Sequence, residues 1–92
     1  MLTKFQVVSV DDGRLSTVDF GSRVVNASVA IQGFNVAYSG GDHHVKSIVT
    51  KAAINGVSGS SVSISGNCYM TDNSSNRGAG SLDVLVIAEC ES

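Results

Sequence analysis

The sequence predicts an all-β protein, a small antiparallel β-sandwich of about six strands. The 92-residue chain contains no proline, ten glycines and many serines, valines and isoleucines. This composition favours short strands joined by glycine and serine turns. Turn signals recur about every 8–12 residues, and no stretch shows a helical period of apolar residues. The length indicates a single domain, residues 1–92, with only a modest core.

Six apolar or alternating runs supply the expected strands. The clearest alternates apolar and polar side chains from Ser61 to Met70, which is typical of a half-buried antiparallel strand. Turn signals stand at Asp11-Asp12-Gly13, and Asn55-Gly56 and Gly59-Ser60 together mark the connection before residue 61. The expected strands are residues 3–10, 15–20, 27–36, 45–54, 61–70 and 82–88, and the polar segment 71–80 is expected to be a surface loop.

The third run changes phase at Gly33. Val29 and Ile31 fall on one parity, whereas Phe34 and Val36 fall on the other. A glycine inside a strand pattern often marks a β-bulge, in which one extra residue turns the following side chains to the other face. We therefore expect a bulge that lets all four apolar residues face one core.

The last run, residues 82–88, is apolar at nearly every position, which indicates that both of its faces are covered. Either another subunit or the N-terminal strand, folded across it, could cover the second face. We favour a homo-oligomer, because association would also cover the free edges of a small sheet.

Charge and cysteine content limit the classes of partner. A formal charge of -2 predicts neither nucleic-acid binding nor attachment to an anionic membrane. Without an apolar run of roughly 20 residues or a signal-peptide pattern, we expect a soluble protein. Cys68 and Cys90 could form one disulfide, but in the absence of an export signal two reduced, buried thiols are favoured.

The segment Asp42-His43-His44 is the first candidate site, because imidazole and carboxylate groups bind metals and histidine transfers protons near neutral pH. Neighbouring residues at the start of a strand point to opposite faces, so the two histidines do not readily share one ion. We expect no metal there. A turn fixed by Asp42 with the histidines at a subunit contact is the favoured interpretation, and contact with a ligand is the next.

The second candidate site surrounds the predicted loop after the alternating strand. Carboxylate and amide groups beside an aromatic ring commonly hold sugars. A plain solvated loop is the alternative interpretation. The residues concerned are Tyr69, Asp72, Asn73, Asn76 and Arg77.

Enzyme activity has no support in the sequence. No serine lies in a nucleophile-elbow context, and Cys68 falls on the apolar parity of its strand. Gly78-Ala79-Gly80 precedes a strand and not a helix, so it lacks the helix N-terminus that a phosphate loop requires. We therefore expect a non-enzymatic protein without a cofactor.

Five segments follow one another in a recognisable order: Val18-Asp19-Phe20, Ser28 to Val36, His44 to Ile48, Cys68 to Asp72 and Val84 to Ala88. In this order they resemble the H-type lectin domain of snail agglutinins and slime-mould discoidins. The resemblance implies a six-stranded sandwich that forms trimers or hexamers and binds galactose-type sugars between subunits. His44 stands where that family has an arginine and Met70 where it has a tryptophan, whereas Asp72 keeps an acidic position.

Two functions follow as hypotheses. The favoured one is an oligomeric, lectin-like module that binds carbohydrate at subunit boundaries. The alternative is a structural β module of a phage or prophage-encoded fibre without sugar binding. The candidate ligand contacts are Asp42, His43, His44, Tyr69, Asp72 and Arg77.

Overall fold

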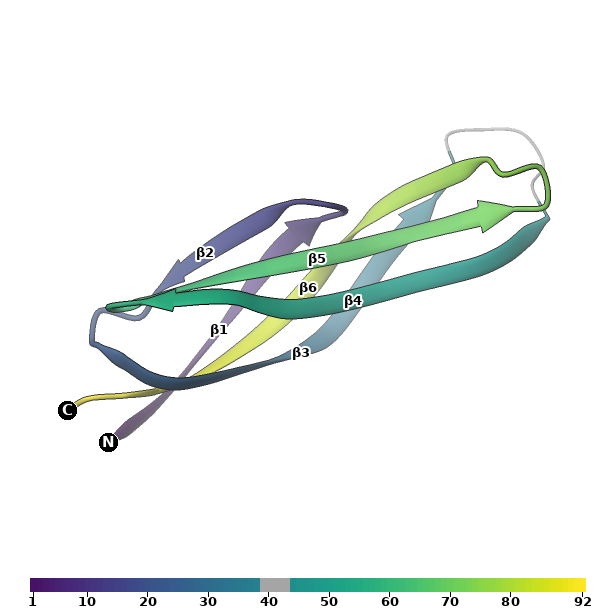
Figure 1. Ribbon diagram of the computed structural model, residues 1–92. Coiled ribbons are helices and arrows are strands. Elements are labelled where there is room, and N and C mark those ends of the chain that lie inside the picture. Colours follow the sequence, from purple (N-terminus) through teal and green to yellow (C-terminus); the bar gives the residue numbers. More distant parts are fainter. Residues whose placement is uncertain (39–43) are drawn as a thin grey trace.

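The computed structural model describes residues 1–38 and 44–92, and in these residues it is all-β, as the sequence predicts (Figure 1). This described part holds no helix that could cross a membrane. The six antiparallel strands are β1 (Leu2–Asp11), β2 (Leu15–Asp19), β3 (Val24–Ala37), β4 (Val45–Ser58), β5 (Ser61–Asp72) and β6 (Arg77–Cys90).

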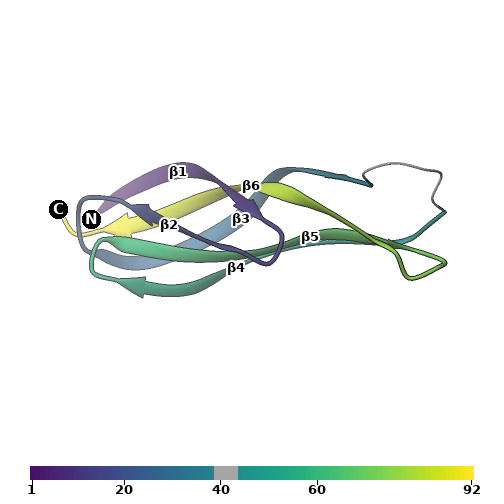
Figure 2. The ribbon, with the colours of Figure 1, turned by 90° about the horizontal axis from the view of Figure 1, so that it is seen from above.

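The long strands β5 and β6 organise the sheet. They pair with each other only near their shared loop, where Tyr69 lies opposite Ala79 and Thr71 opposite Arg77, and then they diverge. Beyond this fork, β6 pairs with β1 and β3, while β5 pairs with β2 and β4. Two three-stranded layers result, β1-β6-β3 and β2-β5-β4, which Figure 2 shows from above.

The sheet is therefore curled and its two sides differ. The turn that joins β1 and β2 enters the fork on one side, whereas β3 and β4 face each other on the other side (Figure 1). The molecule is also elongated, with extents of 53 × 18 × 16 Å and a radius of gyration of 15.6 Å. A compact chain of this length has a radius of gyration of about 12 Å. The core is accordingly long and narrow.

Alternation along β5 and β6 builds that core. The even-numbered residues from Val62 to Met70 are buried, and the intervening residues lie on the outer surface, as the pattern predicts. Hydrophobic burial of this kind is the main stabilising term. The core side chains of these two strands are Val62, Ile64, Cys68, Leu82, Val84, Val86, Ala88 and Cys90.

The predicted bulge in β3 is confirmed. The register shifts between Ile31 and Gly33, so that Ile31 lies opposite Val84 and Phe34 opposite Leu82. Both partners on β6 are fully buried, which places Ile31 and Phe34 on the inner face of their layer. The bulge thus keeps both halves of the strand directed inward, although Ile31 and Phe34 themselves stay exposed.

Of the two turn signals predicted between the fourth and fifth strands, Gly59-Ser60 is confirmed and Asn55-Gly56 is wrong. The chain reverses at Gly59, which has a φ of 58°. Asn55 and Gly56 lie inside β4, whose register shifts between Ile54 and Gly56. A glycine marks a bulge as readily as a turn, and the local pattern does not separate the two.

The predicted surface loop over residues 71–80 is also shorter than expected. Thr71 pairs with Arg77 across the β5–β6 hairpin, so that only residues 73–76 connect the two strands. The sequence does not reveal that the strands extend into this segment, because their ends are polar and lie at the solvated end of the sheet.

The last strand is not buried on both faces within one chain. Its inner residues have no exposed surface, but Leu85 and Ile87 on the outer face are only partly buried. The N-terminal strand β1 lies beside β6, with Val7 opposite Leu85 and Phe5 opposite Ile87, and does not cross its face.

Replacement of Gly80 by alanine should destabilise the fold, because a Cβ atom there would fall on the backbone carbonyl of Asn35. We expect Gly80→Ala to lower the free energy of unfolding by about 1–3 kcal/mol or more. Gly56→Ala is the matched control, since its Cβ would meet no atom within 4 Å. Urea titration of both variants measures the difference, and equal midpoints would contradict the close approach of β3 and β6.

Candidate functional site

The turn between β1 and β2 enters the fork where β5 and β6 separate. On the β6 side, the amide of Asp12 donates to the carbonyl of Gly80 (3.0 Å). On the β5 side, the amide of Gly13 donates to the carbonyl of Gly66 (2.9 Å). The amide of Gly66 in turn donates to the carbonyl of Arg14 (3.3 Å). Gly13 has a φ of 73°, which glycine adopts without strain. The turn therefore bridges the two central strands.

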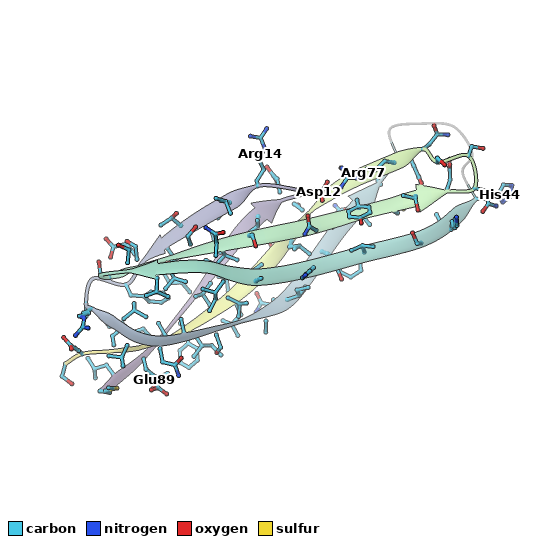
Figure 3. The ribbon with its side chains drawn as sticks, viewed as in Figure 1. Asp12, Arg14, His44, Arg77 and Glu89 are labelled. Atoms are coloured by element: carbon cyan, nitrogen blue, oxygen red, sulfur yellow. The ribbon has the colours of Figure 1, made fainter. Side chains whose placement is uncertain are left out.

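The carboxylate of Asp12 is the central group of this region. Its Oδ1 accepts a hydrogen bond from the amide of Cys68 (2.9 Å), and its Oδ2 pairs with Nη2 of Arg77 (2.7 Å). The side chain is only 7% exposed. A buried carboxylate requires such partners, because its desolvation is otherwise costly. Figure 3 shows Asp12 and Arg77 side by side.

Arg77 in turn lies over an aromatic ring. Its guanidinium carbon is 4.1 Å from the ring centroid of Tyr69, the geometry of a cation–π contact. The arginine side chain is 51% exposed, so one part of the guanidinium is held by Asp12 while another part reaches solvent. The result is a fixed, charged and partly aromatic surface on the outside of the β5–β6 hairpin.

A polar hollow adjoins this surface. It has a volume of about 540 Å³ and is open to solvent. Asp12 belongs both to the hollow and to the ion pair with Arg77, and Ala79 in its wall lies opposite Tyr69 in the strand register. The lining residues are Asp11, Asp12, Arg14, Asn35, Ala37, Ala79, Gly80 and Ser81.

Asp72 organises the loop between β5 and β6. Its Oδ1 accepts hydrogen bonds from the amides of Ser74 and Asn76 (2.8 Å each), and its Oδ2 accepts one from Nδ2 of Asn76 (3.0 Å). Ser75 adopts a φ of 65° within this turn. With both oxygens directed to its own loop and 5% of the residue exposed, Asp72 shapes the loop.

Two neighbouring segments are tied to the same loop. The hydroxyl of Tyr38 donates to the carbonyl of Asn76 (3.1 Å), and the amide of Asn73 donates to the carbonyl of His44 (3.2 Å). Burial raises the pKa of the Tyr38 hydroxyl, and the negative charge of Asp72 raises it further. Tyr38 therefore stays protonated as a donor at neutral pH.

The structure brings only part of the predicted site together. Tyr69 and Arg77 are in contact, whereas His44 stands exposed at the tip of the molecule, away from Arg77 (Figure 3). Asp42 and His43 lie outside the described residues. Sequence reasoning did not single out Asp12 as a site residue. The only local sign of its role is that Asp12 follows another acidic residue, Asp11, directly before the turn glycine.

Within residues 1–38 and 44–92, no three histidine, cysteine or acidic side chains gather as a metal-ligand set. Burial raises the pKa of the Cys68 thiol, with a further contribution from the charge of Asp12. The thiol is directed to the carbonyl of Asn35 (3.8 Å) and stays protonated, so it is a poor nucleophile.

No family model, curated protein or solved structure matches this chain. The resemblance to H-type lectins stays a prediction from the sequence. The geometry of the Tyr69–Arg77–Asp12 group is therefore the basis for any functional proposal.

Removal of the Asp12 carboxylate should loosen the fork. In Asp12→Ala the buried amide of Cys68 loses its acceptor, which costs about 1–3 kcal/mol. Loss of the ion pair adds little, because Arg77 is half exposed and can be solvated. Asp11→Ala is the matched control, since Asp11 is exposed on the neighbouring position. Urea unfolding measures both, and an unchanged midpoint for Asp12→Ala would contradict the role of this carboxylate.

Both cysteines should be protected from reagents in the folded protein. Cys68 and Cys90 form no disulfide and have no exposed surface. Their modification therefore requires local or global opening of the fold. We expect an aromatic disulfide reagent at pH 8 to react at least about two orders of magnitude more slowly in buffer than in urea. Rapid reaction of one thiol in the native protein would show that the core is open at that position.

Proposed function

We propose that this chain is an oligomeric carbohydrate-binding module whose sugar contacts centre on Tyr69 and Arg77. The observation that carries the proposal is the guanidinium of Arg77, fixed at once by the Asp12 carboxylate and by the ring of Tyr69. A group that is already held in place loses little conformational entropy when a ligand binds. Sugars are suited to such a surface, because they offer hydroxyl groups and apolar C–H faces together.

The chemistry around the stack supports the same ligand class. Guanidinium provides five N–H donors, of which the ion pair with Asp12 occupies only part. The adjoining hollow adds the amide of Asn35, the hydroxyl of Ser81 and the charge of Arg14. Open polar hollows beside an aromatic side chain fit a neutral sugar better than an apolar ligand. The sequence resemblance narrows the expected ligand to galactose-type glycans.

Binding to a glycan array tests this proposal. The wild-type protein should give signal on galactose-type glycans, and Tyr69→Ala should weaken it by about tenfold or more, equivalent to about 1.4 kcal/mol. Phe5→Ala is the matched aromatic control, because Phe5 is exposed on the opposite layer.

An absence of signal on every glycan would overturn the carbohydrate proposal. Equal loss in Tyr69→Ala and Phe5→Ala would also contradict it, because the effect would then not come from the Tyr69–Arg77 surface.

A second candidate is a structural module that assembles without binding sugar. Its support is the number of large apolar side chains that one chain leaves exposed, eleven in the described residues. So many in a 92-residue chain are expected when further burial comes from association. Oligomers without glycan binding would favour this function over the first.

A further inference from the structure

The open side of the curled sheet exposes residues that belong to the interior. Six large apolar side chains on β3 and β4 are between 37% and 53% exposed, and all of them except Val25 have a strand partner in the register. Their strand partners place them on the inner face, since Phe34 lies opposite Leu82, Ile48 opposite Met70 and Val57 opposite Val62. The residues of this β3–β4 slot are Ile31, Phe34, Val45, Ile48 and Val57.

Register shifts explain why both strands direct apolar groups to the slot. In β3 the shift between Ile31 and Gly33 keeps Phe34 inward, and in β4 the shift between Val45 and Ser47 brings Val45 and Ile48 to the same face. Without the second shift, these two residues would point to opposite faces. The sequence thus maintains an apolar slot along two strands that no third layer of the described residues covers.

The strand edges beside the slot lack the usual protection. Natural sheets block free edges with charged residues, proline or short strands. Like β1 and β2, strands β3 and β4 lie at edges of the sheet; each is 14 residues long, and β3 contains neither a charged residue nor proline. On β4 the charges are Lys46 and Lys51, of which Lys51 lies opposite Asn67 on the outer face. An edge of this kind is expected to be covered in the functional protein.

We infer that the β3–β4 slot is the surface through which copies of this chain associate. The inference rests on the oligomer in the proposed function and names its contact surface. A second copy is the fitting occupant because the inward-facing positions of β3 and β4 that have a strand partner carry no charge, so two identical slots meet without repulsion.

The slot supplies part of the area that a stable interface needs. A strand of 14 residues is about 46 Å long, and packed layers lie about 10 Å apart, so the strip covers roughly 460 Å². The contact must therefore include the adjoining strand edges to approach the roughly 800 Å² that each partner contributes to a standard interface. The contact would also bury part of the apolar surface that the elongated, narrow core leaves exposed.

The other apolar surface of the molecule is less suited to a second copy. Phe5 and Val7 form it with Leu85 and Ile87 on the outer face of the β1-β6-β3 layer. Asp83 and Glu89 flank this row, and among the described outer positions of that layer the only cation is Arg77, at the start of β6 and away from the row. Two copies meeting there would bring carboxylates together, and like charges disfavour such a contact.

Molar mass in solution tests the inference. Wild type at about 10 µM should have a mass well above the 9.5 kDa of one chain by light scattering after gel filtration. Phe34→Lys and Ile48→Lys should each shift the mass toward one chain. Phe5→Lys, the matched control on the other apolar surface, should leave it unchanged. Circular dichroism verifies that all variants keep their β spectrum.

A monomeric wild type, or a mass lowered by Phe5→Lys and not by the slot variants, would overturn the inference. If a lysine variant fails to fold, cross-linking takes its place as the test: Phe34→Cys and Phe5→Cys are each treated with a bifunctional maleimide. The native thiols are buried, so the reagent reacts with the introduced cysteine. Covalent oligomers at position 34 alone support the inference, and their formation at position 5 alone contradicts it. Slot-dependent oligomers without glycan binding would refute the sugar proposal and retain this one.

Discussion

The buried carboxylate of Asp12 holds the β1–β2 turn in the fork between β5 and β6, and the shape of the molecule depends on this contact. It joins the amide of Cys68 on one central strand to Arg77 on the other. The β1–β2 turn therefore ties the two layers together on one side of the curled sheet, although β1 and β2 pair only with β6 and β5 and not with each other. Since the same contact fixes Arg77 over Tyr69, the interaction that shapes the fold also positions the group proposed to meet a sugar.

On the opposite side of the sheet, the described residues of β3 and β4 also lie side by side without pairing. The edge strands β3 and β4 face each other across apolar side chains that are about half exposed, and an uncovered apolar edge is prone to pairing with another chain. A chain of 92 residues gains little stability from a narrow core, so association through this side would supply burial that the single chain lacks. The closed side and the open side thus have different proposed roles, recognition and assembly.

Local patterns predicted much of this fold, and long-range contacts explain what they missed. The alternation from Val62 to Met70 and the phase change at Gly33 are local, and both are confirmed. The role of Asp12 was missed because its partner Cys68 lies 56 residues along the chain, and no local period records that contact. The charge-free edge of β3 was readable in the sequence, but its place on the open side depends on the topology.

Hydrogen–deuterium exchange at two protein concentrations tests most directly whether the open side is closed by another copy. Edge amides exchange freely in one chain and slowly in an interface. At high concentration β3 and β4 should gain protection that dilution removes, while β5 and β6 stay protected at both concentrations. Protection of β3 and β4 that does not depend on concentration, or a dependence confined to β1 and β6, would contradict the account.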